Sequence, residues 1–240
     1  MNKLYLIPST LGDCEPAQVL PASVLALLPS IQCYVVEEER TVRRFLSRAG
    51  LKGHIDSLEF HTLNEHTTQA GVEAMAKLFE KGDVGLISEA GLPAVADPGA
   101  ALVALCHRTG IQVVPLVGPS SLMLALMASG LNGQSFAFRG YLPAKTEERR
   151  NAMRNVEKTS AALDQTQIII ETPYRNDTFF ADILNCLSPT TKVCVAADIT
   201  LETEFIRTLR VEQWKKMVKD GFTIGKRPCV FLVKAGKNID

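Results

Sequence analysis

Short apolar runs alternate with amphipathic segments in the first half of the chain, a pattern typical of βαβ units and a parallel sheet. Glycines follow three of the helical segments, where a left-handed C-cap is expected, at Gly50, Gly82 and Gly110. The predicted strands are Leu4–Ile7, Cys33–Glu37, Leu58–His61, Val84–Ser88 and Gln112–Leu116. The predicted helices are Ala22–Leu28, Thr41–Ala49, Thr68–Glu80 and Ala100–Thr109.

The pattern restarts after Val117 with an almost wholly apolar helix, Ser120–Ser129, which we expect to be buried on most sides. Connections near the end of the chain are short, which favours antiparallel pairing there. We therefore predict two α/β domains, residues 1–117 and 118–240. The predicted strands of the second are Ser135–Arg139, Gln167–Glu171, Lys192–Asp198, Thr203–Thr208 and Cys229–Lys234. Its remaining predicted helices are Thr146–Glu157, Asn176–Leu187 and Val211–Lys219.

The charges balance, with 26 Lys plus Arg against 26 Asp plus Glu. A neutral chain argues against tight nonspecific binding to nucleic acid, so RNA recognition would require a local basic patch. The six cysteines lack CxxC spacing, which argues against a zinc site and favours a reducing, cytoplasmic setting. Apolar runs fall short of the ~18 residues of a membrane span. We expect neither a metal nor a membrane.

The stretch Ile87–Gly99 is the most informative, because it joins a strand to a helix where open α/β sheets bind ligands. Gly91 and Gly99 permit close backbone approach, and Pro93 and Pro98 stiffen the loop. Such a loop offers backbone groups to a polar ligand such as adenosine. Asp97 alternatively caps the next helix, as in an ordinary connection.

Other polar residues follow strands at the same sheet edge. The Pro8–Asp13 turn has neither a dinucleotide-binding nor a P-loop pattern, but its place at the end of the leading strand favours contact with a ligand over a plain turn. Gly118–Ser121 opens a helix whose N-terminus suits a carboxylate. The acidic Glu38 and the polar Asn64 begin helices, for which capping is the simpler interpretation. The most basic segment includes Lys145, Arg149, Arg150, Arg154 and Lys158, diluted by glutamates.

In this order the motifs resemble those of the ribosomal RNA small-subunit cytidine 2′-O-methyltransferases, a branch of the tetrapyrrole methylase superfamily. The resemblance extends from Leu4 to Gly236 and is carried by Ser88–Gly99, Val113–Ser120 and Gly140–Lys145. It implies a homodimer of two α/β domains, with a mostly parallel N-terminal sheet and a mixed C-terminal sheet. S-adenosylmethionine would lie in a cleft between the domains, and small-subunit ribosomal RNA would be the partner.

The resemblance also implies site residues. Cofactor contacts would fall on Pro8, Glu89, Gly91, Pro93, Asp97, Ser120, Leu142, Thr172, Pro173 and Ala197. Substrate contacts would fall on Arg40, Asn64, Glu65, Lys145, Arg149 and Arg175. The chain departs from the family where Glu38-Glu39-Arg40 replaces Asp-Thr-Arg and Tyr174 replaces a histidine. Cofactor-type features survive better than substrate-type ones, which indicates a divergent paralogue.

Methyl transfer to a ribose hydroxyl requires that donor and acceptor be aligned. It also requires a base, because the pKa of the hydroxyl is high. Glu38 and Glu65 are the candidate bases, because the cofactor loop should occupy Glu89 and Asp97. Three functions remain open from the residues: an RNA methyltransferase, a methyltransferase of a small molecule such as a tetrapyrrole, and a cofactor-binding protein without turnover.

Overall fold

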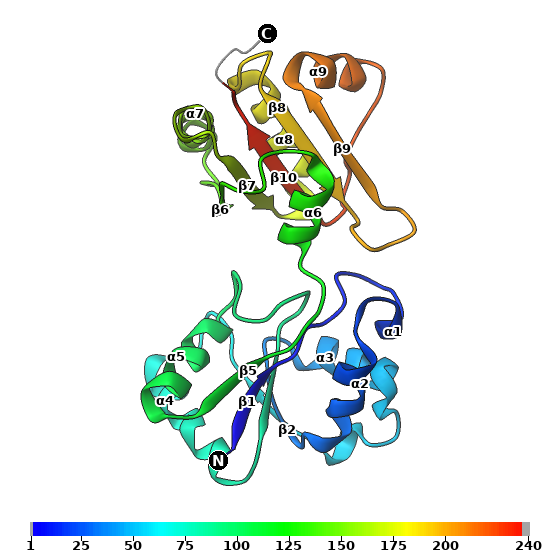
Figure 1. The fold of residues 1–240 in the computed structure, drawn as a ribbon, viewed down its shortest axis with the longest axis vertical. Coiled ribbons are helices and arrows are strands. Elements are labelled where there is room, and N and C mark those ends of the chain that lie inside the picture. The colour runs from blue at the N-terminus through cyan, green and yellow to red at the C-terminus, as the bar shows by residue number, and fades with distance from the viewer. Residues whose placement is uncertain (1, 237–240) are drawn as a thin grey trace. The chain divides into compact units, whose positions relative to one another are not determined.

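The computed structural model describes residues 2–236, which form two compact units that divide between Ser120 and Ser121. Each unit contains one five-stranded sheet with helices against it (Figure 1). The first sheet is wholly parallel and the second is mixed, as predicted. No helix among the described residues is long and apolar enough to cross a membrane.

The first sheet has the order β3-β2-β4-β1-β5. Its strands are β1 (Lys3–Leu6), β2 (Cys33–Val36), β3 (Glu59–Thr62), β4 (Val84–Ile87) and β5 (Gln112–Pro115). The helices of this unit are α1 (Pro16–Val19), α2 (Ala22–Leu27), α3 (Glu39–Leu46), α4 (Gln69–Ala74) and α5 (Gly99–Thr109). Shorter helical turns are η1 (Leu28–Ser30), η2 (Ser47–Leu51), η3 (Ile55–Ser57) and η4 (Met75–Glu80).

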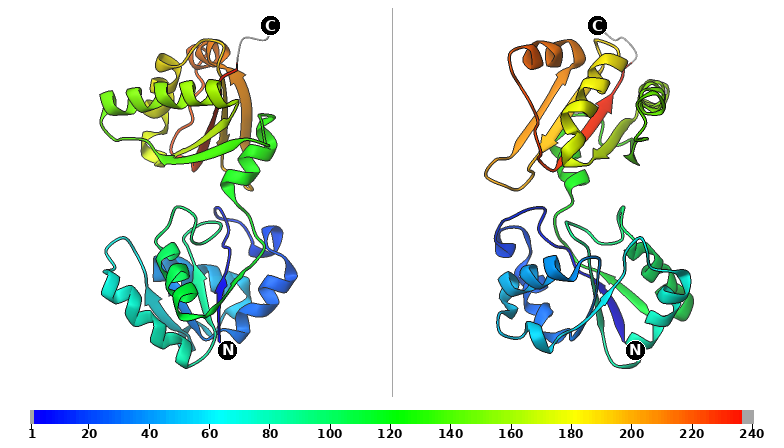
Figure 2. Two further views of the ribbon diagram at one scale, coloured as in Figure 1. Left: turned by 60° about the vertical axis from the view of Figure 1, so that its left-hand side comes forward. Right: turned by 180° about the vertical axis from the view of Figure 1, so that it is seen from behind.

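Side chains alternate between the two faces of this sheet, because successive residues of a strand point in opposite directions. Cys33 and Val35 pack with α4 and α5 residues, whereas Tyr34 and Val36 pack with α2 and α3 residues. Figure 2 shows these helices on both sides of the strands. A parallel sheet covered on both faces leaves its carboxyl edge as the place for a site.

The second sheet has the order β6-β7-β10-β8-β9. Its strands are β6 (Phe136–Tyr141), β7 (Thr166–Glu171), β8 (Lys192–Ala197), β9 (Phe205–Arg210) and β10 (Cys229–Lys234). Its helices are α6 (Ser121–Ser129), α7 (Thr146–Leu163), α8 (Asn176–Cys186) and α9 (Val211–Lys219), with the turn η5 (Pro173–Arg175). Strand β10 pairs antiparallel with β7 and with β8, and β8 pairs antiparallel with β9. The short connections near the end of the chain predicted this antiparallel pairing.

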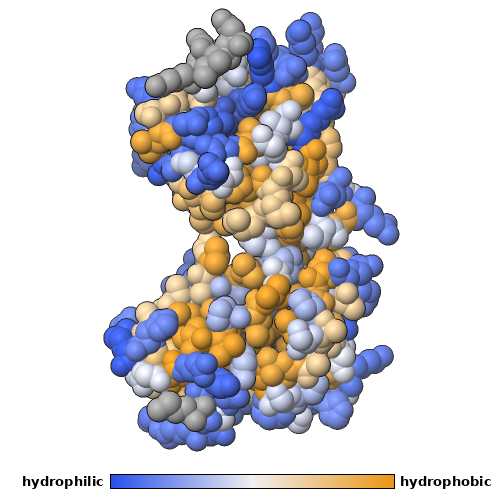
Figure 3. All heavy atoms as spheres, in the orientation of Figure 1, coloured by the Kyte–Doolittle hydropathy of each residue, from blue (hydrophilic) through white to orange (hydrophobic). Residues whose placement is uncertain are grey.

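Several local predictions were wrong. Gly82 does not adopt the left-handed conformation, whereas Gly50 (φ 107°) and Gly110 (φ 74°) do. The segment predicted as one helix is a six-residue α-helix, Gln69–Ala74, followed by a six-residue 3-10 helix, Met75–Glu80. The apolar helix α6 buries Ala125, Leu126 and Ser129 but leaves Met127 exposed. Figure 3 shows hydrophobic colouring over the part of the second unit where α6 lies.

Candidate functional site

Three loops come together at the carboxyl edge of the first sheet. The backbone N–H of Ser9, after β1, donates to the carbonyl of Gly91, after β4, at 2.9 Å. A Cβ on Gly91 would lie 2.9 Å from a methyl carbon of Leu11, and one on Gly118 would overlap the ring of Pro8. Glycine is therefore required where these loops touch. The structure thus brings the predicted residues Pro8 and Gly91 together.

The loop after β4 has an unusual backbone. Gly91, Ala94 and Ala96 all have positive φ, at 73°, 64° and 60°, which is rare for alanine. The carboxylate of Asp97 stabilises this path by accepting hydrogen bonds from the N–H groups of Ala94 (2.8 Å) and Gly99 (2.7 Å). Burial raises the pKa of Asp97, and these hydrogen bonds oppose the rise. Asp97 therefore holds its own loop and the start of α5, the simpler of the two roles expected for it.

Four carboxyl groups lie within electrostatic range at this edge. Burial and the negative charges of Glu89, Asp97 and Glu65 together raise the pKa of Glu37, which follows β2. Like charges that disfavour one another favour a cation between them. This acidic edge fits a ligand with a positively charged sulfur, and Pro93 beside it is buried in the loop wall.

The remaining predicted residues of this edge make local contacts. Glu38 is the N-cap of α3, its carboxylate accepting a hydrogen bond of 2.9 Å from the N–H of Arg40. The side-chain oxygen of Asn64 accepts one of 3.0 Å from the N–H of His66. Glu65 is exposed and lies 3.6 Å from the His66 ring. Capping, the simpler interpretation, accounts for Glu38 but not for Asn64, because the next helix, α4, is capped by Thr68. The catalytic role of Glu38 and the substrate role of Asn64 stay predictions.

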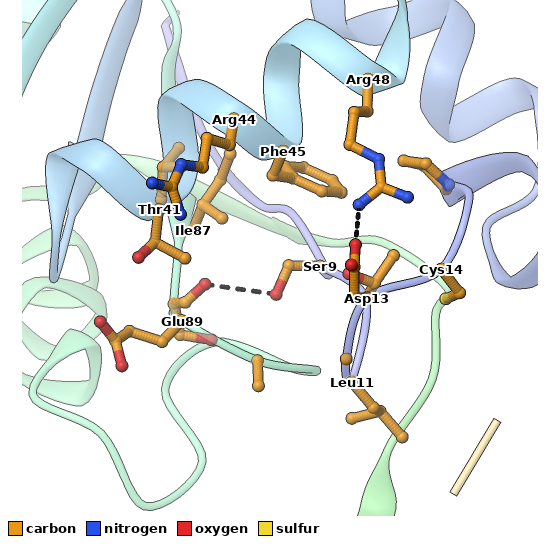
Figure 4. A pocket seen from close by; sticks show the side chains of 16 residues that line it. Ser9, Leu11, Asp13, Cys14, Thr41, Arg44, Phe45, Arg48, Ile87 and Glu89 are labelled. Carbon is orange, nitrogen blue, oxygen red and sulfur yellow. Dashed lines mark hydrogen bonds and ion pairs between the residues drawn. The ribbon is translucent and has the colours of Figure 1, made fainter. Parts of the chain in front are cut away.

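A pocket of about 540 Å³ opens beside these loops within the first unit. Figure 4 shows its walls: α3 and the following turn on one side, the loop after β1 on another, and the end of β4 with Glu89 on a third. The volume is in the range of small-ligand sites. Arg44 and Arg48 extend into it from the helical side, and the buried rings and chains of Phe45 and Val42 form its apolar part.

The second unit uses its predicted polar residues differently. Arg149 is buried and donates from Nε to Asp182 at 2.9 Å and from a terminal nitrogen to the carbonyl of Ala144 at 2.6 Å. Because the guanidinium is satisfied inside the unit, it has a structural role, and the predicted substrate contact has no support. Lys145 is exposed and pairs with Glu148 at 3.3 Å.

The end of β7 carries a second ion pair. Arg175 lies 3.1 Å from a carboxylate oxygen of the buried Glu171, whose other oxygen accepts from the N–H of Thr172 at 2.8 Å. Pro173 then starts the turn η5. Among the other predicted cofactor contacts of this unit, Ala197 is fully buried at the end of β8 and Leu142 packs against the core. Ser120 is half-buried just before α6.

A thiol, a carboxylate and an imidazole also meet on the first sheet. The ligand atoms of Cys33, Glu59 and His61 lie within 4.8 Å of one another. Glu59, however, already bonds to His61 at 2.8 Å and lies 3.4 Å from the Lys81 ammonium. Burial raises the pKa of the Cys33 thiol to about 11, which disfavours the thiolate that a metal needs. The cluster carries no assignment.

Two residues of the site were missed by the sequence interpretation. Glu37 was treated as the end of a strand, although its position after β2 places it at the same edge as Glu89. Arg44 was treated as part of an ordinary helix. Its spacing of four from Arg40 was the available signal, because residues four apart lie on one helix face.

Two comparisons reach most of the chain. A profile of the family Tetrapyrrole (Corrin/Porphyrin) Methylases matches residues 22–214. The ribosomal RNA small subunit methyltransferase I of Vibrio cholerae is 30% identical over 96% of this chain and 76% of its own length. The protein of the same name from Escherichia coli O157:H7 is 30% identical over 98% and 79%.

Solved structures agree on the fold. The uroporphyrin-III C-methyl transferase of Thermus thermophilus, complexed with S-adenyl homocysteine, superimposes with a TM-score of 0.58 at 18% identity, over 97% of each chain. The fold and the family profile together define a methyltransferase. The chain belongs to the tetrapyrrole methylase family, whose members are S-adenosylmethionine-dependent methyltransferases. The predicted family, fold class and enzyme class are therefore confirmed.

Proposed function

We propose that this enzyme transfers a methyl group from S-adenosylmethionine to a ribose 2′-hydroxyl of small-subunit ribosomal RNA. The observation that carries the RNA part is the match of nearly the whole chain to relatives named ribosomal RNA small subunit methyltransferase I. In this proposal the protein acts in the cytoplasm as a homodimer, as the family resemblance implies.

The donor belongs at the carboxyl edge of the first sheet. The loop held by Asp97 supplies backbone groups for the adenosine, and the acidic edge around Glu37 and Glu89 favours the sulfonium. Bound S-adenosylmethionine supplies the methyl group. The chain's own residues position it, exclude water and remove the acceptor's proton.

A carboxylate near the acceptor accepts the hydroxyl proton as the methyl group arrives. Glu65 stays our candidate for this base, because its side chain is exposed, whereas Glu38 is engaged in capping α3. Glu65→Gln should lower kcat by about 100-fold with KM for the donor unchanged. A Glu38→Gln variant serves as the comparison, because glutamine retains the capping oxygen. Normal turnover in Glu65→Gln would remove that residue from the chemistry.

The decisive experiment supplies purified small ribosomal subunits and isotope-labelled S-adenosylmethionine to the enzyme. Nuclease digestion and mass spectrometry should find the label on one ribose. Calorimetry with S-adenosylmethionine alone tests the donor separately.

A small molecule is the second candidate acceptor, favoured by the zero net charge of the chain. Uroporphyrinogen III replaces the ribosomal subunits in a parallel assay. Label on that molecule, with unmodified RNA, would overturn the RNA proposal while leaving the donor assignment intact.

A further inference from the structure

The arginines of the α3 region differ in their partners. Arg43 pairs with Glu39 at 3.4 Å and with Asp56, and Arg48 pairs with Asp13 and with Glu15 at 3.0 Å. No carboxylate of residues 2–236 lies within 4 Å of the guanidinium groups of Arg40 and Arg44. The two are four residues apart and therefore lie on one face of α3. This face carries two positive charges that have no carboxylate partner within the part of the chain that the structure describes.

Arg44 also lines the pocket of about 540 Å³ described above. Figure 4 shows it extending from α3 on the side of Thr41, with Glu89 on another wall. Thr10 and Thr41 add hydroxyl groups to the lining, and Phe45 adds an apolar surface. The pocket thus has a cationic wall and a carboxylate wall. An anion would lie against Arg44, away from Glu89, with its uncharged part against the apolar surface.

We propose that this pocket binds a phosphate group of the RNA strand through Arg44, and that Arg40, one turn earlier, binds the adjoining phosphate. The inference rests on the proposed RNA substrate and deepens it. Arginine suits this task because its planar guanidinium donates two parallel hydrogen bonds to a phosphate. Arg48 shapes the pocket wall but is not available to a phosphate, because its guanidinium is paired with two carboxylates, those of Asp13 and Glu15. Two local cations allow a neutral chain to bind RNA.

The test measures binding of a fluorescently labelled single-stranded oligocytidylate by anisotropy at several salt concentrations. Arg44→Gln should weaken binding about fivefold near 0.1 M salt and reduce the slope of log K against log salt by about 0.7, the value for one phosphate contact on a single strand. Arg40→Gln should act in the same direction. Arg44→Lys should restore the slope, because it keeps the charge.

Two control variants remove the same positive charge at positions outside the pocket. Arg43→Gln changes the neighbouring arginine on another face of α3, and Arg154→Gln changes an exposed arginine of α7 whose side chain bonds to Asn151. Both should leave the salt slope unchanged, and thermal unfolding should show that every variant is folded. A slope in Arg44→Gln equal to that of the wild type, or an equal loss in the two controls, would overturn the inference.

The design separates this inference from the proposed function. Wild-type enzyme that methylates RNA while Arg44→Gln binds it normally would refute the pocket assignment alone. Wild-type enzyme that binds S-adenosylmethionine but no RNA would refute the RNA substrate, and the phosphate site with it. Arg44-dependent binding of uroporphyrin III, a polycarboxylate, without RNA binding would overturn the phosphate assignment in favour of the small-molecule acceptor.

Discussion

Two helices, one in each unit, present neighbouring arginines after a strand, and the structure uses the two pairs in opposite ways. On α3, Arg43 is paired with carboxylates, whereas Arg44 lines a pocket and forms no ion pair with any described residue. On α7, Arg149 and Arg150 both bind Asp182 of α8. The sequence motif is the same, so the role of each arginine depends on whether an acid lies opposite it in the fold.

The energetics of the two sites differ accordingly. Arg149 and Asp182 are about 95% buried as side chains, and the hydrogen bonds from both arginines outweigh desolvation and lower the pKa of Asp182. A buried pair of this kind is costly to break, because the remaining partner is left as an uncompensated charge. An exposed arginine such as Arg44 contributes little to stability and is available to a ligand.

The largest expected effect comes from breaking the buried pair. Arg149→Met should destabilise the second unit by about 3 kcal/mol, because Asp182 keeps only its half-exposed partner Arg150. Urea denaturation followed by fluorescence of Trp214, the single tryptophan, reports on that unit. Arg44→Met should change stability by less than about 0.5 kcal/mol. Equal losses of stability in the two variants would contradict the proposed difference between the arginines of α3 and α7.

A smaller effect is expected where the loops of the first unit touch. Gly118→Ala would force a methyl group against the Pro8 ring, which should cost about 1–3 kcal/mol and weaken S-adenosylmethionine binding. Gly133→Ala, where no atom lies within 4 Å of the added carbon, is the matched control. Calorimetric titration and thermal unfolding measure both quantities. Unchanged donor affinity in a Gly118→Ala protein of reduced stability would separate this contact from the cofactor site.

The smallest effect concerns the acidic edge. Burial and neighbouring carboxylates raise the pKa of Glu37 above its ordinary 4.5, so its ionised form disfavours the folded state. The favourable contribution of protonated Glu37 is complete below the ordinary pKa and is lost as pH rises through the raised value. Glu37→Gln, which cannot ionise, should therefore raise the melting temperature at neutral pH and lose this advantage below about pH 4.5.

The exposed Glu80 supplies the control for this series, since Glu80→Gln removes a charge away from the acidic edge. A gain in Glu37→Gln that persists unchanged at low pH would show that the ionisation of Glu37 is not its cause.

Periodicity predicted the two sheets because it depends on the chain alone. Short, continuous apolar runs such as Cys33–Val36 identify strands covered on both sides, and the short connections around β9 identify antiparallel pairing. Helix ends were less accurate: α7 extends to Leu163, beyond the predicted Glu157, because its last turns pack through residues such as Ser160 rather than through an apolar stripe.

Of the site, the sequence by itself determined where backbone chemistry is required, which is the Gly91 loop with its two prolines after the strand that leads to Glu89. Glycine and proline impose local conformations, so their meaning can be read without a fold. Only the tertiary structure decided that Arg149 is satisfied by Asp182, 33 residues away, while Arg44 remains unpaired beside a pocket. Charge pairing depends on which side chains face each other in space, and no local pattern records that.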